Sequence, residues 1–123
     1  MKTISVALGK RSYPIWIEQG LLKRVSDLLN PMNTGNKWVI VTQKSIQTHY
    51  GNTLLQQLKD AGFNAELVTI PIGEEAKSIR EFENLQRKLI ELGCDRKTIL
   101  IAFGGGVVGD VAGFAAATFM RGI

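Results

Sequence analysis

The sequence has few of the residues that a disulfide scaffold, a metal centre or a membrane span requires. Its 123 residues include one cysteine, Cys94, and one histidine, His49. A single cysteine excludes an internal disulfide and gives no sign of an oxidising compartment, so a cytoplasmic location is expected. No run of about 20 apolar residues is present that could cross a bilayer. Residues 1–10 alternate between polar and apolar, as a strand does and a signal peptide does not.

An excess of charge of one sign is also small. The chain has 15 Lys and Arg against 11 Asp and Glu, which gives a net charge of +4. The basic residues are scattered and are not interleaved with aromatics, so a nucleic-acid groove is not expected and a phosphate-bearing small molecule suits the excess better. With 45% hydrophobic and 21% charged residues, the composition is that of an ordinary globular domain. It excludes a disordered tail, a collagen-like chain and a coiled coil.

The apolar pattern predicts alternating strands and helices in one domain, residues 1–123. Residues 3–8 and 13–17 predict an N-terminal β-hairpin, which is followed by a helix over 21–29. Three buried strands are predicted at 38–42, 65–70 and 98–103, each followed by a helix. This order predicts a Rossmann-like, doubly wound α/β fold with a mostly parallel sheet, and a site at the carboxyl ends of the strands.

Two of these helices carry further expectations. The helix after the turn at 71–73 should begin with the acidic residues Glu74 and Glu75, end at Gly93, and bury one apolar side, formed by Ile79, Phe82, Leu85, Leu89 and Ile90. The last helix, 107–120, is apolar all round, with ten apolar residues among fourteen. We infer that a partner or a further segment covers it.

The glycine-rich run Gly104–Gly109 is the strongest chemical signal. It reads G-x-G-x-x-G between a strand and a helix, where glycines let a backbone approach a phosphate. The usual dinucleotide fingerprint also needs an acidic residue about 20 positions later, and only fourteen residues follow Gly109. Asp110, in the first helical turn, would repel a pyrophosphate and is expected to accept hydrogen bonds from hydroxyls or to cap the helix. A close-packing turn is the alternative.

A second candidate segment, Gly73–Lys77, lies at another strand-to-helix junction, hence on the same edge of the sheet. Lys77 could meet a phosphate or a ribose and Glu74 a hydroxyl or an amide, and a solvated helix start is the alternative. Arg121 either reaches solvent or binds an anion. His49 and Cys94 have no partner at a suitable spacing, so neither a metal site nor a catalytic dyad is predicted.

Residues 96–122 closely resemble the signature of the 3-dehydroquinate synthase family, in the stretch from Arg96-Lys97-Thr98 through the glycines to Phe119-Met120-Arg121-Gly122. Residues 73–78 resemble the other N-terminal motif of the family, and the order of elements fits over all 123 residues. The family enzyme is much longer, so the chain resembles its N-terminal NAD-binding part, without the C-terminal helical domain.

The resemblance implies conversion of 3-deoxy-D-arabino-heptulosonate 7-phosphate, a sugar acid phosphate, to 3-dehydroquinate and phosphate in the shikimate pathway. NAD would be a catalytic cofactor, a divalent metal (zinc or cobalt) would be needed in the full-length enzyme, and a homodimer is expected. The metal ligands and the catalytic residues would lie outside these residues, so the chain alone should bind nucleotide and be inactive.

By the same resemblance, the pyrophosphate would lie against the glycine-rich loop and the nucleotide against the second motif. The implied cofactor residues are Gly105, Gly106, Val107, Val108, Gly109 and Asp110, together with Gly73, Glu74, Glu75, Ala76 and Lys77. Arg121 would hold the substrate phosphate. Gln43 and Ser45 stand where the family often has Asp or Asn for the adenosine ribose, so that contact would be altered.

Two alternatives remain open from the sequence. One is a different enzyme with a similar cofactor loop, either another sugar phosphate cyclase or an enzyme like glycerol dehydrogenase. The other is a non-catalytic module that binds nucleotide or associates through the apolar helix at 107–120.

Overall fold

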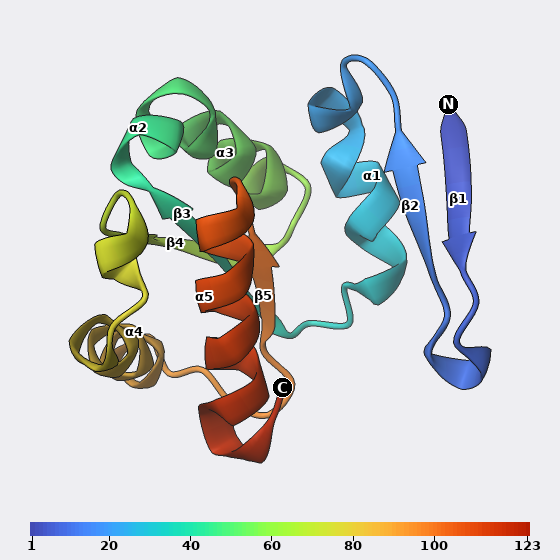
Figure 1. Cartoon of the computed structure of the whole chain (residues 1–123). Coiled ribbons are helices and arrows are strands. Elements are labelled where there is room, and N and C mark those ends of the chain that lie inside the picture. Colours follow the sequence, from blue (N-terminus) through green and yellow to red (C-terminus); the bar gives the residue numbers. More distant parts are fainter. The chain divides into compact units, whose positions relative to one another are not determined.

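The computed structural model describes residues 1–123, which form two compact units, Met1–Pro31 and Met32–Ile123. The first unit begins with the expected hairpin: β1 (Lys2–Val6) pairs antiparallel with β2 (Tyr13–Ile17) (Figure 1). The helix expected over 21–29 is divided into a 3-10 turn and the short α1 (Val25–Leu29).

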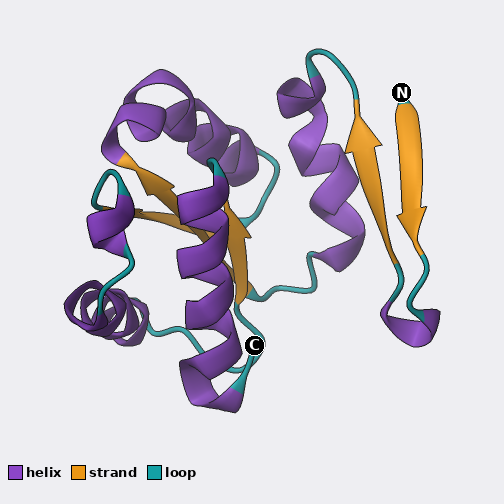
Figure 2. Ribbon diagram, in the orientation of Figure 1, coloured by secondary structure: helices purple, strands orange, loops and turns teal.

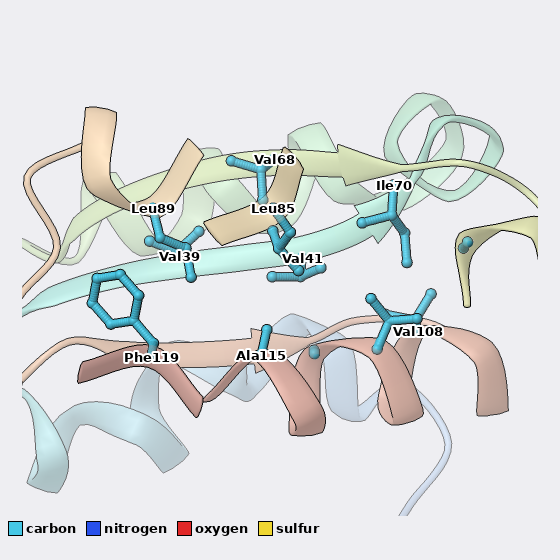
Figure 3. Close-up of a cluster of buried hydrophobic side chains, with 12 residues drawn as sticks. Val39, Val41, Val68, Ile70, Leu85, Leu89, Val108, Ala115 and Phe119 are labelled. Carbon is cyan, nitrogen blue, oxygen red and sulfur yellow. The ribbon is translucent and has the colours of Figure 1, made fainter. Parts of the chain in front are cut away.

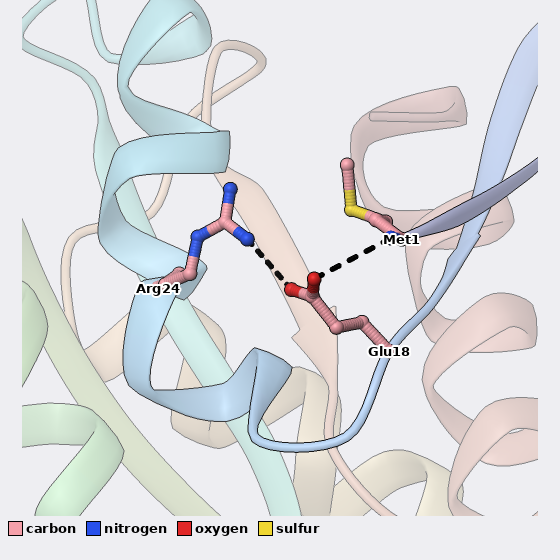
Figure 4. A network of polar contacts seen from close by, with 3 residues as sticks. All are labelled: Met1, Glu18 and Arg24. Carbon is pink, nitrogen blue, oxygen red and sulfur yellow. Dashed lines mark hydrogen bonds and ion pairs between the residues drawn. The ribbon is translucent and has the colours of Figure 1, made fainter.

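No residue of this first unit is fully buried. A small polar network links the amino terminus to the residues after β2. The Arg24 guanidinium donates to Glu18 Oε2 at 2.6 Å, and the amino terminus of Met1 lies 3.6 Å from Glu18 Oε1 (Figure 4). Exposed ion pairs contribute little to stability, about 0–1 kcal/mol each. The hairpin therefore has no buried core of its own.

The second unit contains a parallel sheet of three strands, β3 (Lys37–Gln43), β4 (Asn64–Ile70) and β5 (Ile99–Ala102), in the order β4-β3-β5 (Figure 2). The first crossover contains α2 (Lys44–Ile46), a π-helical turn and α3 (Asn52–Asp60). The second contains α4 (Ile79–Glu91), and α5 (Gly106–Thr118) follows β5. The strands and crossovers lie where the apolar pattern predicts them.

One face of the sheet packs against α4 and α5. The side chains that form this core alternate along β3 and β4 and meet one side of each helix, as Figure 3 shows for Val39, Val41, Val68, Ile70, Leu85, Leu89, Val108, Ala115 and Phe119. These side chains are at most 8% exposed. Burial of this kind stabilises the fold by roughly 1.5–3 kcal/mol per large side chain.

The other face packs against α3. Trp38 alternates with Val39 and so points the other way, where its ring meets Phe63 edge-on with centroids 5.1 Å apart. On the same face, Leu67 approaches Gly51, at the start of α3, with Cδ1 3.3 Å from where a Cβ of Gly51 would lie. Helices on both faces of a parallel sheet confirm the doubly wound α/β fold.

Two expectations about the helices need correction. The apolar side assigned to α4 is narrower than expected, because Leu85 and Leu89 are buried while Ile79 is 86% and Ile90 66% exposed. In α5, one side is buried within this chain and the opposite side, which includes Gly113 and Phe114, is exposed. The helix ends at Thr118, earlier than expected, because Met120 and Arg121 have positive φ angles of 48° and 68°.

None of the helices combines the length and the apolar character that a membrane span requires.

Candidate functional site

The carboxyl ends of the three parallel strands meet at one edge of the sheet. The register aligns Gln43 at the end of β3 with Ile70 of β4, and Val41 with Ala102 at the end of β5. Ligands of open α/β sheets bind outside this edge. The loops that follow β3, β4 and β5 are therefore the candidate site.

The glycine-rich loop is anchored to β3 just before its first glycine. The Phe103 amide donates to the Val41 carbonyl at 2.9 Å, and the Thr42 hydroxyl donates to the Phe103 carbonyl at 2.6 Å. Thr42 is fully buried, so its hydroxyl needs such an acceptor. These two bonds fix the direction in which the chain leaves the sheet.

The glycines of this loop have different physical roles. A Cβ on Gly104 would lie 2.6 Å from Val108 Cγ2, so only glycine allows this close packing of loop and helix. A Cβ on Gly105, Gly106 or Gly109 would meet nothing within 4 Å. The space beside these three residues is open, and the first amides of α5 have no acceptor within the helix. The loop therefore presents free backbone donors to an open cradle, which a phosphate group would fill.

The candidate segment Gly73–Lys77, which lies after β4, begins with a glycine that no other residue could replace without strain. Gly73 has φ 82° and ψ −172°, a region that is almost confined to glycine. A single 3-10 turn, Glu74–Ala76, follows, and the Lys77 amide closes it by donating to the Glu74 carbonyl at 2.9 Å. The turn exposes Glu74 and buries Ala76.

The prediction that Glu74 and Glu75 form the first turn of α4 is wrong. The helix begins after Ser78, whose hydroxyl accepts the amide of Glu81 at 3.2 Å, and Lys77 before it has non-helical dihedral angles. Ser78 is thus the N-cap. Glu74 and Glu75 lie in a separate turn and do not occupy the α4 N-terminus.

An ion pair joins the two loops. Lys77 Nζ lies 2.8 Å from Asp110 Oδ2 and 3.6 Å from Glu74 Oε2. The hydrogen bond to Asp110 is the largest cause that raises the pKa of Lys77 above the ordinary lysine value, so the ammonium stays charged at neutral pH. The sequence predicts that these loops share one edge, and the structure brings Lys77 and Asp110 into direct contact.

A cavity of about 380 Å³ opens beside this ion pair, between the start of α4 and the side of α5. Phe82 and Phe114 form part of its wall, with ring centroids 5.0 Å apart. Its mostly apolar lining comprises Ala76, Lys77, Ser78, Ile79, Phe82, Asp110, Val111 and Phe114. Sequence reasoning missed the aromatic wall, although Phe114 lies four residues after Asp110 and hence on the same side of the helix.

The segment after β3 also reaches the glycine-rich loop. Ile46 Cδ1 lies 3.1 Å from where a Cβ of Gly104 would be, and Gln43 Nε2 donates to the Pro71 carbonyl at 3.3 Å. Ser45 is exposed in the same turn. The segment 43–46 therefore lies against the other loops of this edge.

Arg121 is not brought to this edge. It follows the carboxyl end of α5, while the glycine-rich loop precedes the amino end, and a helix of 13 residues is roughly 20 Å long. Its side chain is exposed. Arg121 therefore cannot contact a ligand in the cradle of this chain.

The remaining reactive side chains lie apart from the cradle. His49 is exposed in the π-helical turn, and burial raises the pKa of the half-buried Cys94 thiol, which makes it a poor nucleophile at neutral pH. No three side chains of His, Cys, Asp or Glu gather in a way that could hold a metal ion.

The sequence and the fold of the chain are similar to those of known proteins. Residues 67–123 match the family model described as 3-dehydroquinate synthase N-terminal. The whole chain is 43% identical to 3-dehydroquinate synthase of Syntrophotalea carbinolica and 42% identical to that of Pelotomaculum thermopropionicum. The chain is similar in sequence to 3-dehydroquinate synthase, and its second half to the N-terminal part that the family model describes. It spans about a third of these enzymes, 34% and 33% of their lengths.

Solved structures of sugar phosphate cyclases have the same fold. The chain superposes on 2-deoxy-scyllo-inosose synthase, solved with carbaglucose-6-phosphate, NAD+ and Co2+, with a TM-score of 0.85 and 24% identity, over 99% of this chain and 33% of that one. For 2-epi-5-epi-valiolone synthase of Streptomyces hygroscopicus, solved with NAD+ and Zn2+, the TM-score is 0.76 and the identity 25%, over 95% of this chain and 32% of that one. The similarity to 3-dehydroquinate synthase expected from the motifs is confirmed.

Proposed function

We propose that the chain is the NAD-binding part of a 3-dehydroquinate synthase. The observation that carries this proposal is the open cradle beside Gly105, Gly106 and Gly109, with the Lys77–Asp110 ion pair at its side. A cradle without side chains, at a helix N-terminus, suits a pyrophosphate. The sequence similarity to named 3-dehydroquinate synthases supports the same assignment.

Different residues would contact different parts of the dinucleotide. The amides of Gly106, Val107 and Val108 at the start of α5 would bind the pyrophosphate. Gly105 and Gly109 would line the open cradle, since the Gly109 amide donates to the Gly105 carbonyl at 3.0 Å. Glu74 and Asp110 carry carboxylates that can accept hydrogen bonds from ribose hydroxyls. Gln43 and Ser45, at the end of β3 beside the glycine-rich loop, would meet the adenosine ribose. The domain proposed for this function is residues 1–123.

The proposed reaction of the complete enzyme is conversion of 3-deoxy-D-arabino-heptulosonate 7-phosphate to 3-dehydroquinate and phosphate. When bound, NAD supplies a transient oxidation of a substrate hydroxyl. The contribution of this chain is to bind and orient the dinucleotide at the sheet edge. Arg121, which lies outside the cradle, would hold a substrate phosphate of a neighbouring subunit in a homodimer. The zinc or cobalt ligands would lie outside these 123 residues, and the location would be the cytoplasm.

A second candidate is another sugar phosphate cyclase, because the fold superposes on 2-deoxy-scyllo-inosose synthase with a TM-score of 0.85. Its identity of 24% is well below the 43% found with a 3-dehydroquinate synthase. We therefore favour the latter. Product analysis with a full-length enzyme that carries this chain distinguishes the two candidates.

The binding proposal is tested by recording the amide spectrum of the isotopically labelled chain during titration with NAD. Shifts are expected at Gly104–Asp110 and Gly73–Lys77. The substitution Gly105→Ala fills the cradle and should weaken binding by about tenfold or more, whereas Gly113→Ala, on the exposed side of the same helix, should leave it unchanged. A dispersed spectrum that does not respond to NAD would contradict the proposal.

An activity assay tests whether the catalytic residues lie outside the 123-residue chain. Phosphate release is expected from the full-length enzyme with NAD and zinc, and not from the 123-residue chain under the same conditions. Release by the chain alone would show that the catalytic residues lie within it.

A further inference from the structure

The environment of Lys77 differs from that of a lysine whose only partner is a bound phosphate. Its ammonium lies between two carboxylates, 2.8 Å from Asp110 and 3.6 Å from Glu74. The lysine side chain is 38% exposed, whereas those of Asp110 and Glu74 are 68% and 80% exposed. The lysine is thus the least exposed member of the cluster, and Asp110 is the carboxylate within hydrogen-bond distance of its ammonium.

Asp110 lies one turn into α5, close to where a pyrophosphate would bind. It follows Gly109, beside which the cradle is open. A carboxylate at this position repels a negatively charged ligand, which offsets the attraction of the helix N-terminus. Lys77 is the one cation that contacts this carboxylate. With the pair formed, the ammonium offsets the charge of Asp110, while the contact uses Oδ2 and leaves Oδ1 to accept a hydroxyl.

We propose that Lys77 is a positioning residue that neutralises and orients Asp110, so that the start of α5 accepts a pyrophosphate while Asp110 accepts a ribose hydroxyl. This inference rests on the proposed NAD site. It assigns Lys77 a different role from the direct contact with the nucleotide that the motif implies.

The two roles predict different results when both residues are changed. If Lys77 acts through Asp110, removal of the lysine exposes a negative charge, and removal of that charge by Asp110→Asn restores binding. If Lys77 contacts the phosphate directly and independently of Asp110, the substitution Asp110→Asn changes the Kd by the same factor with and without the lysine. A double-mutant cycle on NAD affinity therefore separates the roles.

The experiment measures the Kd of NAD by calorimetry for the 123-residue chain and for Lys77→Met, Asp110→Asn and the double variant, at low and high salt. We expect Lys77→Met to weaken binding by about fivefold or more at low salt and by less at high salt, since salt screens the exposed charge. The double variant should bind at least about threefold more tightly than Lys77→Met. Lys97→Met removes the same charge before β5, at the opposite edge of the sheet, and should change the Kd little.

Each outcome has one meaning. The inference would be overturned, and the NAD site left standing, by a smaller effect of Lys77→Met, by an effect that does not fall with salt, by a double variant no better than Lys77→Met, or by an equal gain from Asp110→Asn when Lys77 is present. Failure of the unmodified chain to bind NAD would contradict the proposed function itself. The amide spectrum of each variant shows that the chain is folded.

Discussion

Two of the strand-to-helix junctions of the site, those after β4 and β5, contribute different chemical groups. The junction after β5 is built from glycines, and its chemical groups are backbone amides beside open space. The junction after β4 has one glycine and carries charged side chains, of which Lys77 contacts Asp110, one turn into α5. One junction contributes shape and donors, and the other contributes charge.

Under the proposed function, this difference allows a short segment to bind a charged ligand without a surplus of cations. The backbone donors at the helix start are fixed by the fold and cost no side-chain entropy on binding. The charged side chains can then pair with one another, as Lys77 does with two carboxylates. Substitutions in the two junctions should therefore destabilise the fold for different physical reasons.

The largest effect is expected for Gly104→Ala in the glycine-rich junction. The added Cβ would lie 2.6 Å from Val108 Cγ2 and 3.0 Å from Val108 Cβ, in a region where Val108 is fully buried. We expect a loss of about 2–3 kcal/mol in the free energy of unfolding, measured by urea denaturation. Gly105→Ala is the matched control and should leave this free energy unchanged within about 0.5 kcal/mol. Equal losses in both variants would refute the distinction between packing and cradle glycines.

A somewhat smaller effect is expected for Gly73→Ala in the charged junction, because the cause there is backbone strain and not a clash. A Cβ on Gly73 would meet nothing within 4 Å, but φ is 82°. Urea denaturation should show a loss of about 1–2 kcal/mol. Gly113→Ala, within α5, should instead gain up to about 1 kcal/mol, as alanine is the better helix former. A neutral Gly73→Ala would mean that the turn can change its conformation.

The substitution Ser78→Ala removes the cap that separates the charged turn from α4. The amide of Glu81 would lose its acceptor at 3.2 Å, and about 1 kcal/mol of stability should be lost in the same assay. Ser78→Asp keeps a capping oxygen and should retain most of the stability. If alanine and aspartate behave alike, the Ser78 side chain does not act as the cap.

The smallest effect concerns the pH dependence of the ion pair between the junctions. Because the pKa of Lys77 is raised in the folded state, the stabilisation from this pair is fully present below the ordinary pKa of lysine and is lost as the pH rises through the folded value. The difference in stability between the unmodified chain and Lys77→Met should stay constant up to about pH 10 and then shrink. Denaturation curves from pH 7 to about pH 11 measure it, and a difference that already shrinks near neutral pH would contradict the assignment.

Much of this arrangement could be predicted from the sequence, because the relevant signals are local. The apolar runs that form β3, β4 and β5 and the glycines after β5 place the sheet and its carboxyl edge. The break between Lys77 and Ser78 was missed because acidic residues also suit a helix start. A local signal was present: Ser78 and Glu81 have the spacing of a capping box.

The remainder depends on contacts between distant parts of the chain. The pairing of Phe82 with Phe114 and the exposure of Ile79 follow from how α4 lies against α5. No periodicity along the sequence fixes the angle or register of two packed helices, so these features required the structure.

The strand order also sets an order of assembly. Trp38 of β3 pairs with Ala65 of β4 but also with Ile99 of β5, which is more than twice as far along the chain. Closing the longer loop costs more chain entropy, so β3 and β4 have the advantage in pairing first and β5 docks afterwards onto an existing edge. The glycine-rich loop leaves the sheet from β5. During synthesis, therefore, a nascent chain holds most of its core strands before it has a ligand cradle, and the cradle forms with the last strand to join.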